Sequence, residues 1–366
     1  MPSWTWEEWT AWGEPDYQGV DPDDAQLQAF LKKQGPALVY LRIAAEKPGC
    51  YFDRDYGRPS IDMLLPELGK LRNAARLLAL DARVKATEGS AGEALNDVNA
   101  MFAMAEHTGN DPILVSMLVA IAIDETAAET LQAVVRSSQV SQADLSGVDL
   151  DAGLAYPRLF ERSLRMEEAF GTSVFCDVAS GRVGIHELVG DSGAASHADL
   201  GSLYRVFLLA DDVAANRRFM RRYREMAGKP YYAVKPEWEG FEAELERDPG
   251  GLLTRLLLPA LSRCAQVAAR GDATRRVARL ALAALRYRAR HNRLPEKLDD
   301  LAGEFILSVP NDPFDGKPMK LKQTGNGVVI YSIGPDMVDD GGTPLEKETP
   351  PGESCRRGDV VFELPK

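Results

Sequence analysis

Cysteine is scarce in this chain and is never paired at short spacing. The 366 residues contain four cysteines, and none belongs to a Cys-x-x-Cys pair; they are Cys50, Cys176, Cys264 and Cys355. This spacing excludes a zinc knuckle and a thioredoxin-type redox site. We expect buried free thiols, with one or two long-range disulfides as the alternative if the chain is exported.

Histidine and long apolar segments are scarce as well. The four histidines form no His-Glu-x-x-His pair, and no glycine-rich phosphate-binding pattern occurs, so the sequence shows no machinery for metal-dependent or nucleotide-dependent catalysis. The longest apolar run, 113–123, is about half the length that crosses a bilayer and predicts a buried helix. Since no basic region followed by an apolar stretch comes after Met1, we expect either a cytoplasmic protein or one whose membrane anchor is encoded upstream of Met1.

Positive charge does not dominate the chain. The net charge is −12 at pH 7, and binding to nucleic acid requires a net or strongly localised positive field. We therefore expect no nucleic-acid partner.

What the sequence does contain is helical periodicity followed by a short strand region. The composition, with 45% hydrophobic residues, is that of a globular protein long enough for two domains. Asp248-Pro249-Gly250-Gly251 is the strongest boundary signal. We predict an α+β fold, with an α-helical domain over 1–250 and a second domain over 251–366.

The second domain is expected to begin with one long basic helix over about 252–291. This segment contains nine arginines and a single acid, Asp272. We therefore expect the helix to pack beside acidic parts of the same chain, with an anionic partner as the alternative. Two strand-like runs around a Gly-Asn-Gly turn and a third short strand then predict a small antiparallel sheet within about 311–364.

A carboxylate-rich loop lies between the second and third of these strands. Asp336, Asp339 and Asp340 fall within five residues, and Asp359 returns just before the last strand. Four like charges in one loop need a cation or full solvation, and Ca²⁺ accepts six to eight oxygen ligands from such a flexible loop. A solvated acidic turn is the alternative interpretation.

The order of elements from Leu257 onward resembles the globular part of the type II secretion system major pseudopilin. Three motifs carry the resemblance: Asp312-Pro313 with Gly316 and Pro318, Tyr331-Ser332-Ile333-Gly334 with Asp336, and Asp359 before the closing strand. The resemblance implies one spine helix packed on a small antiparallel sheet. It also implies a Ca²⁺ ion bound by Asp336 and Asp359, with backbone carbonyls or Ser332 completing the oxygen shell; it fixes no role for Asp339 and Asp340.

The whole chain is also similar to a group of large planctomycete proteins. These proteins join an N-terminal membrane anchor and a helical domain to a pseudopilin-like module. The resemblance implies an extracytoplasmic, membrane-anchored protein. Because the sequence shows no catalytic constellation, we expect a structural or protein-interaction role without enzymatic activity. Filament assembly is not expected, because so charged a helix cannot form an apolar filament core.

Two other functions stay open at this point. One is a hydrolase with its cleft between the helical domain and the basic helix, for which Ser192 and His186 are the candidate residues. The other is a cytoplasmic helical scaffold. The identity of a protein partner and the oligomeric state cannot be predicted from the chain.

Overall fold

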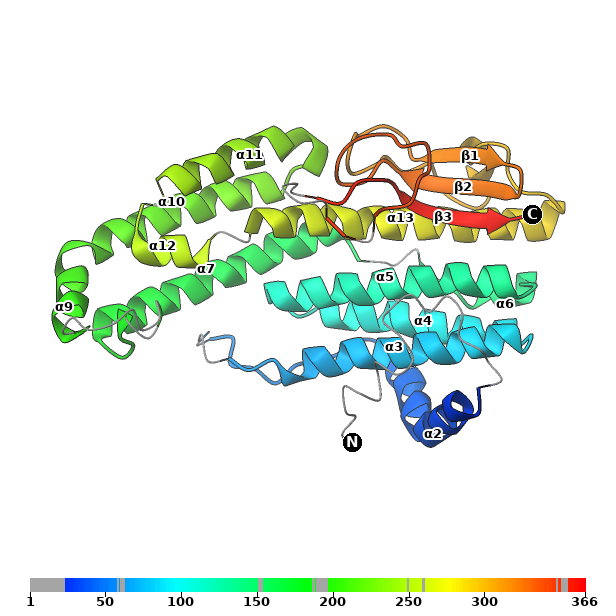
Figure 1. Ribbon diagram of the computed structural model, residues 1–366, viewed down its shortest axis with the longest axis horizontal. Coiled ribbons are helices and arrows are strands. Elements are labelled where there is room, and N and C mark those ends of the chain that lie inside the picture. The colour runs from blue at the N-terminus through cyan, green and yellow to red at the C-terminus, as the bar shows by residue number, and fades with distance from the viewer. Residues whose placement is uncertain are drawn as a thin grey trace.

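The chain folds into stacked layers of helices with a small sheet on one side, as the computed structural model in Figure 1 shows. The structure describes residues 24–57, 59, 63–150, 154–185, 188, 197–248, 250–258, 261–346, 348–349 and 355–366. Its elements are α2 (Ala25–Ala45), α3 (Pro66–Thr87), α4 (Ala91–Gly109), α5 (Leu114–Ser137), α6 (Gln142–Ser146), α7 (Tyr156–Ser180), α9 (His197–Phe207), α10 (Leu209–Ala227), α11 (Tyr231–Arg247), α12 (Leu252–Leu257), α13 (Leu261–His291), a 3-10 helix (Leu298–Leu301), β1 (Lys320–Thr324), β2 (Gly327–Ser332) and β3 (Val360–Pro365). The predicted α+β fold class is confirmed.

Helices α3, α4 and α5 form the helical body beneath α13 (Figure 1). The apolar run 113–123 starts α5, and the helix is buried along most of its length, as predicted. α3 begins at Pro66. The N–H groups of the first helical turn have no partner within the helix, so a proline, which has no N–H, is well suited to this position. The three helices contact one another, and each buries small side chains, among them Ala79, Ala94 and Ala120, which are fully buried.

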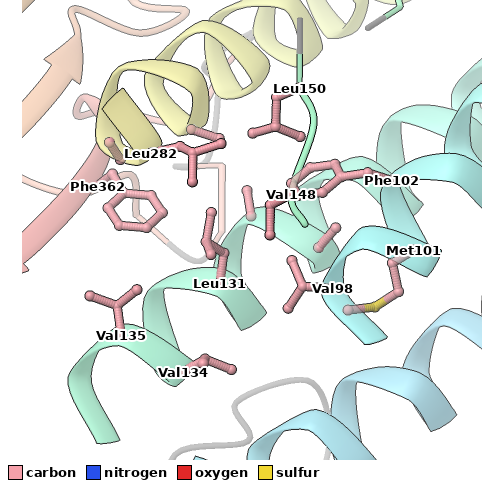
Figure 2. Packing of buried hydrophobic residues seen from close by; sticks show 14 of the residues in the cluster. Val98, Met101, Phe102, Leu131, Val134, Val135, Val148, Leu150, Leu282 and Phe362 are labelled. Carbon is pink, nitrogen blue, oxygen red and sulfur yellow. The ribbon is translucent and has the colours of Figure 1, made fainter. Parts of the chain in front are cut away.

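The small sheet has the order β1-β2-β3, and both pairs are antiparallel. A two-residue loop, Gly325-Asn326, joins β1 to β2, as expected for a tight hairpin. β2 is buried along its whole length, and α13 packs against β2 and β3. Leu282 of α13, Phe362 of β3 and Leu131 of α5 meet in one core (Figure 2), so apolar packing crosses the expected division at 250/251.

The prediction of a single long helix from Leu252 to His291 is wrong. The structure has two helices, α12 and α13, and α12 ends with the backbone N–H of Leu258 donating to the carbonyl of Thr254. The sequence places Pro259 immediately after this point. Proline has no backbone N–H to donate to the preceding turn, which accounts for the interruption.

Helices α7, α9, α10, α11 and α12 form an arm that extends beyond the helical body, with α9 at its far end (Figure 1). Asp212 of α10 fixes α12 within the arm, because its carboxylate accepts from the backbone N–H groups of Leu253 (2.8 Å) and Thr254 (2.9 Å). The Tyr204 hydroxyl of α9 donates to the same carboxylate. A side chain from one helix therefore caps another helix and ties a third to both.

The cysteines of the structure differ in part from the expectation of buried thiols. Cys264 is a buried free thiol, as expected, whereas the free thiols of Cys50 and Cys176 are exposed. Cys176 lies on an exposed face of α7 and Cys50 lies in the irregular segment between α2 and α3, positions that spacing alone does not predict. Within the described residues, no helix combines the length and apolar character needed to cross a membrane.

Candidate functional site

Asp312 organises the residues that lead into the sheet. This buried carboxylate accepts from the backbone N–H groups of Phe314 (2.9 Å) and Ile333 (2.8 Å) and from the hydroxyl of Ser332 (2.8 Å). These three hydrogen bonds connect the turn after Asp312 to the end of β2, 20 residues along the chain. Asp312 stands in a motif of the sequence, but no local pattern identifies it as the acceptor that joins these two segments.

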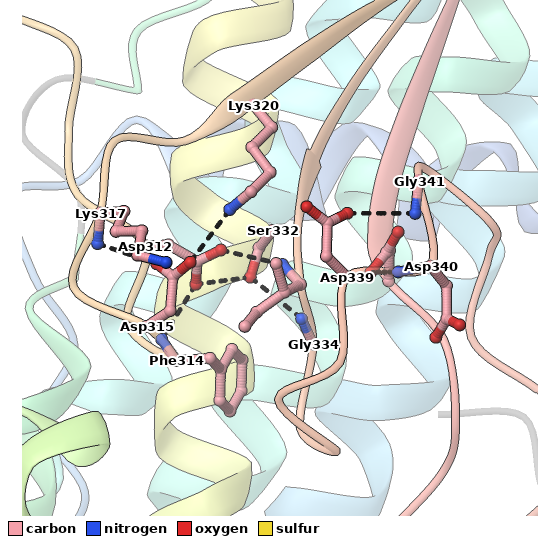
Figure 3. Close-up of polar contacts among 12 residues, drawn as sticks. Asp312, Phe314, Asp315, Lys317, Lys320, Ser332, Gly334, Asp339, Asp340 and Gly341 are labelled. Atoms are coloured by element: carbon pink, nitrogen blue, oxygen red, sulfur yellow. Dashed lines mark hydrogen bonds and ion pairs between the residues drawn. The ribbon is translucent and has the colours of Figure 1, made fainter.

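Ser332 was expected to help complete a calcium shell. It is fully buried at the end of β2, and its hydroxyl donates to Asp312. Figure 3 shows Ser332 and Asp312 in one group of polar contacts and Asp339 and Asp340 in another. The structure therefore places Ser332 in the Asp312 group.

Asp359 and Asp336 join the two distant stretches of the acidic loop. Both oxygens of Asp359 accept backbone N–H groups, from Asp340 (3.3 Å) and Gly342 (2.6 Å). Asp336 accepts from the backbone N–H of Gly358 at 3.1 Å. Burial raises the pKa of Asp359, and the amide donors counteract this effect. The predicted approach of residues 336–342 to residues 358–359 is thus present in the structure.

The other two acids of the loop point to solvent. Asp339 and Asp340 are exposed, and the Asp339 carboxylate accepts from the backbone N–H of Gly341 at 3.1 Å. Among the described residues, no three acidic, histidine or cysteine side chains form a group able to hold a metal ion. All four carboxylate oxygens of Asp336 and Asp359 accept backbone N–H groups, so an ion held by these two side chains would have to share or displace these hydrogen bonds.

A buried ion pair connects α13 to the helical body. Arg275 donates to Asp124 of α5 at 2.5 Å and to Glu106 of α4 at 2.6 Å, and both Arg275 and Asp124 are buried. Burial raises the pKa of Asp124 to about 6, although the charge of Arg275 acts in the opposite direction. The arginine-rich composition of α13 signalled the intramolecular pairing that we expected, but nothing in the sequence identified Asp124 as the partner.

Other arginines of α13 also bind the rest of the chain. Arg270 donates to Glu125 of α5 at 2.8 Å, and Arg286 donates to the backbone carbonyl of Val148 at 2.7 Å. Arg288 reaches the carbonyl of Pro365 at 2.7 Å. The basic helix is therefore held on two sides, by acidic helices and by backbone carbonyls.

A cavity of about 320 Å³ lies where α7, the turn between α10 and α11, and α13 meet. Its walls include the aromatic rings of Phe160, Tyr231 and Trp238, and one end holds Asp272 and Arg276. These two side chains pair with each other at 2.7 Å. The cavity lies in the region where a cleft between the helical domain and the basic helix was expected, but Ser192 and His186 lie outside the described residues.

Comparison of the chain with protein-family models, with curated proteins and with solved structures gives no match.

Proposed function

We propose that this chain is a non-enzymatic structural or protein-interaction protein that works outside the cytoplasm. In this proposal its C-terminal part is a type II secretion pseudopilin-like module of the kind joined to helical domains in planctomycete proteins, and Ca²⁺ stabilises it. The motifs around Asp312, Ser332 and Asp359 support the resemblance. One observation carries the proposal: the buried carboxylates bind partners in segments that are distant in sequence, and so hold the fold together.

Four of these carboxylates show the pattern. Asp97 binds Arg42 and Lys85, and Asp124 binds Arg275. Asp212 and Asp312 accept from backbone N–H groups of other segments. A carboxylate that acts as a general acid or base must reach a substrate, whereas each of these is occupied by a partner that fixes the fold. Their arrangement favours a structural role.

The calcium part of the proposal rests on Asp336 and Asp359, which the loop brings together from two stretches. An ion that binds only the folded state stabilises it by RT ln(1 + [L]/Kd), about 2.7 kcal/mol at a hundredfold excess over Kd. We expect a higher melting temperature in calcium chloride than in EGTA. We also expect Asp336→Asn to remove this difference, while Asp299→Asn, at an exposed position outside the loop, retains it.

The outcome that rejects calcium is equally direct. The same melting temperature in calcium chloride and in EGTA, together with no heat of binding in calorimetry, would leave the loop as a hydrogen-bonded acidic turn. Asp359→Asn is less informative alone, because this side chain also accepts two backbone N–H groups. For Asp359→Asn, only the difference between the melting temperatures in calcium chloride and in EGTA reports on the ion.

The location can be tested with the exposed cysteines. Cys50 and Cys176 are free and exposed, so a membrane-impermeant maleimide should label them in intact cells if the domain lies outside the cytoplasm. Labelling only after lysis would support the cytoplasmic scaffold instead. A Cys50→Ser, Cys176→Ser variant is the control for labelling at these sites.

A hydrolase is the second candidate, and the cavity beside Asp272 and Arg276 is the observation that favours it. An enzyme pocket combines apolar walls with a few convergent polar groups, as this cavity does. The serine version requires that Ser192→Ala abolish hydrolysis of ester or peptide substrates. Unchanged hydrolysis in this variant would exclude it.

A further inference from the structure

The far end of the arm carries a group of exposed apolar side chains. We call it the arm tip; it consists of Leu203, Val206, Phe207 and Leu208, at the end of α9 and the start of α10. Their exposed fractions are 53%, 73%, 69% and 57%. At about 200 Å² for each residue, these fractions give roughly 500 Å² of apolar surface. The largest apolar patch on a soluble monomer is typically about 300–600 Å² and is often functional, and the arm tip falls within this range.

A basic stripe continues from the arm tip along α10. Only Leu208 separates α9 from α10, and helical hydrogen bonds continue through it: its N–H donates to the carbonyl of Tyr204 (2.9 Å), and its carbonyl accepts from Asp212 (3.0 Å). Spacings of three and four residues therefore carry the exposed face from the arm tip to Arg217 and Arg221, with the exposed acids Asp211 and Glu225 also at these spacings. Both arginines are exposed, and no described residue forms an ion pair with either of them.

The distances along this face are short. α10 rises about 1.5 Å per residue, which places Arg217 about 12 Å along the helix from Leu209. This exceeds the Debye length of about 8 Å at physiological ionic strength, so a surface touched by the arm tip alone is largely screened from these arginines. They meet the surface only when the arm lies obliquely on it.

The geometry points to an anionic lipid membrane as the surface that the arm tip binds. We propose that the four apolar side chains insert among the acyl chains, and that Arg217 and Arg221 contact lipid phosphates. Interfacial helices of this type combine leucine and phenylalanine on one part with arginine on another. This inference goes beyond the structural role proposed above and does not depend on calcium or on the pseudopilin resemblance.

The size and position of the patch favour a membrane over a folded protein partner. A stable protein interface buries about 800 Å² on each side, more than the arm tip offers. The arm tip is also the end of a projecting element (Figure 1). A projecting end needs a matching groove in a protein, whereas a fluid lipid layer closes around it without a preformed groove.

Vesicle co-sedimentation tests the proposal with the full chain. The probes are vesicles of phosphatidylcholine alone and vesicles in which one quarter of the lipid is phosphatidylglycerol. We expect binding to both and tighter binding to the anionic vesicles. Phe207→Ser should weaken both by about tenfold or more, because it removes an exposed aromatic side chain that the membrane would bury. Arg217→Gln with Arg221→Gln should remove only the gain from phosphatidylglycerol.

The matched control is Tyr40→Ser on α2, where the native side chain is 72% exposed and lies outside the arm. It should bind vesicles like the wild type. Equal losses in Tyr40→Ser and Phe207→Ser would overturn the proposal, as would a wild-type chain that stays in the supernatant with both vesicles. If sedimentation velocity shows a dimer that Phe207→Ser converts to a monomer, without vesicle binding, the arm tip binds a second copy and the lipid proposal is wrong.

Discussion

Replacing Arg275 of α13 with methionine should destabilise the protein strongly. Asp124 is fully buried and receives its charged hydrogen bond from Arg275 at 2.5 Å. Methionine fills a similar volume but leaves this carboxylate without a counter-charge. Breaking a buried pair by removing one partner costs about 3–5 kcal/mol. We therefore expect the free energy of unfolding to fall by this amount at neutral pH.

Removing both charges together should restore most of the lost stability. Apolar replacements of a buried ion pair are often neutral or stabilising, so Asp124→Leu with Arg275→Met should lie within about 2 kcal/mol of the wild type. The coupling free energy from this double-mutant cycle separates the pair from the packing of each side chain. The control is Arg165→Met, which breaks the exposed pair with Glu161 and should cost less than about 1 kcal/mol.

The pH dependence adds a second signature. The folded pKa of Asp124 is about 6, above its ordinary value of 3.8, so the folded chain binds this proton more readily than the unfolded chain. The resulting stabilisation is present below about pH 4 and is lost as the pH rises through about 6. Without Arg275, the pKa of Asp124 should rise further, because the charge that lowers it is gone. Arg275→Met should therefore be less destabilising at about pH 5 than at neutral pH.

Urea unfolding followed by circular dichroism measures all of these variants, since the unfolding free energy varies linearly with urea concentration. The reasoning is refuted if Arg275→Met stays within about 1 kcal/mol of the wild type, well below the loss expected for a broken buried pair. It is also refuted if the double variant is as unstable as Arg275→Met alone, because the loss would then come from packing.

Three further predictions concern other buried carboxylates. Asp212→Ala should lower the protection of amides in α12 from hydrogen exchange. It should also lower the free energy of unfolding by about 3 kcal/mol, because two N–H groups lose their acceptor. Replacing the exposed neighbour, Asp211→Ala, should leave the protection unchanged. Asp312→Ala should cost a similar amount, about 3 kcal/mol, and expose the amide of Ile333 to exchange; a protected Ile333 amide in this variant would contradict the assigned hydrogen bond. Burial raises the pKa of Asp97 to about 6, so the urea midpoint of unfolding should fall as the pH rises from about 4 to about 6. Asp97→Asn should reduce this dependence of the midpoint on pH. An unchanged dependence would show that other groups cause it.

Local patterns in the sequence predicted the parts of the fold that depend on neighbouring residues. The hairpin between β1 and β2 follows from two strand-like runs around Gly325 and Asn326, and the antiparallel order needs no distant information. The buried helix over 113–123 follows from its apolar run. The break before α13 was also visible in the sequence as Pro259, but the basic periodicity around it obscured the signal.

The tertiary structure decided which polar side chains meet. Arg275 and Asp124 are 151 residues apart, and Ser332 and Asp312 are 20 apart. Periodicity shows that a carboxylate lies on a helix, but only the packing of that helix selects its partner, because any of nine arginines on the basic segment carries the same charge. The sequence alone therefore determined the α+β class and the sheet, whereas the pairing of buried charges and the exposure of the arm tip depend on how the helices stack.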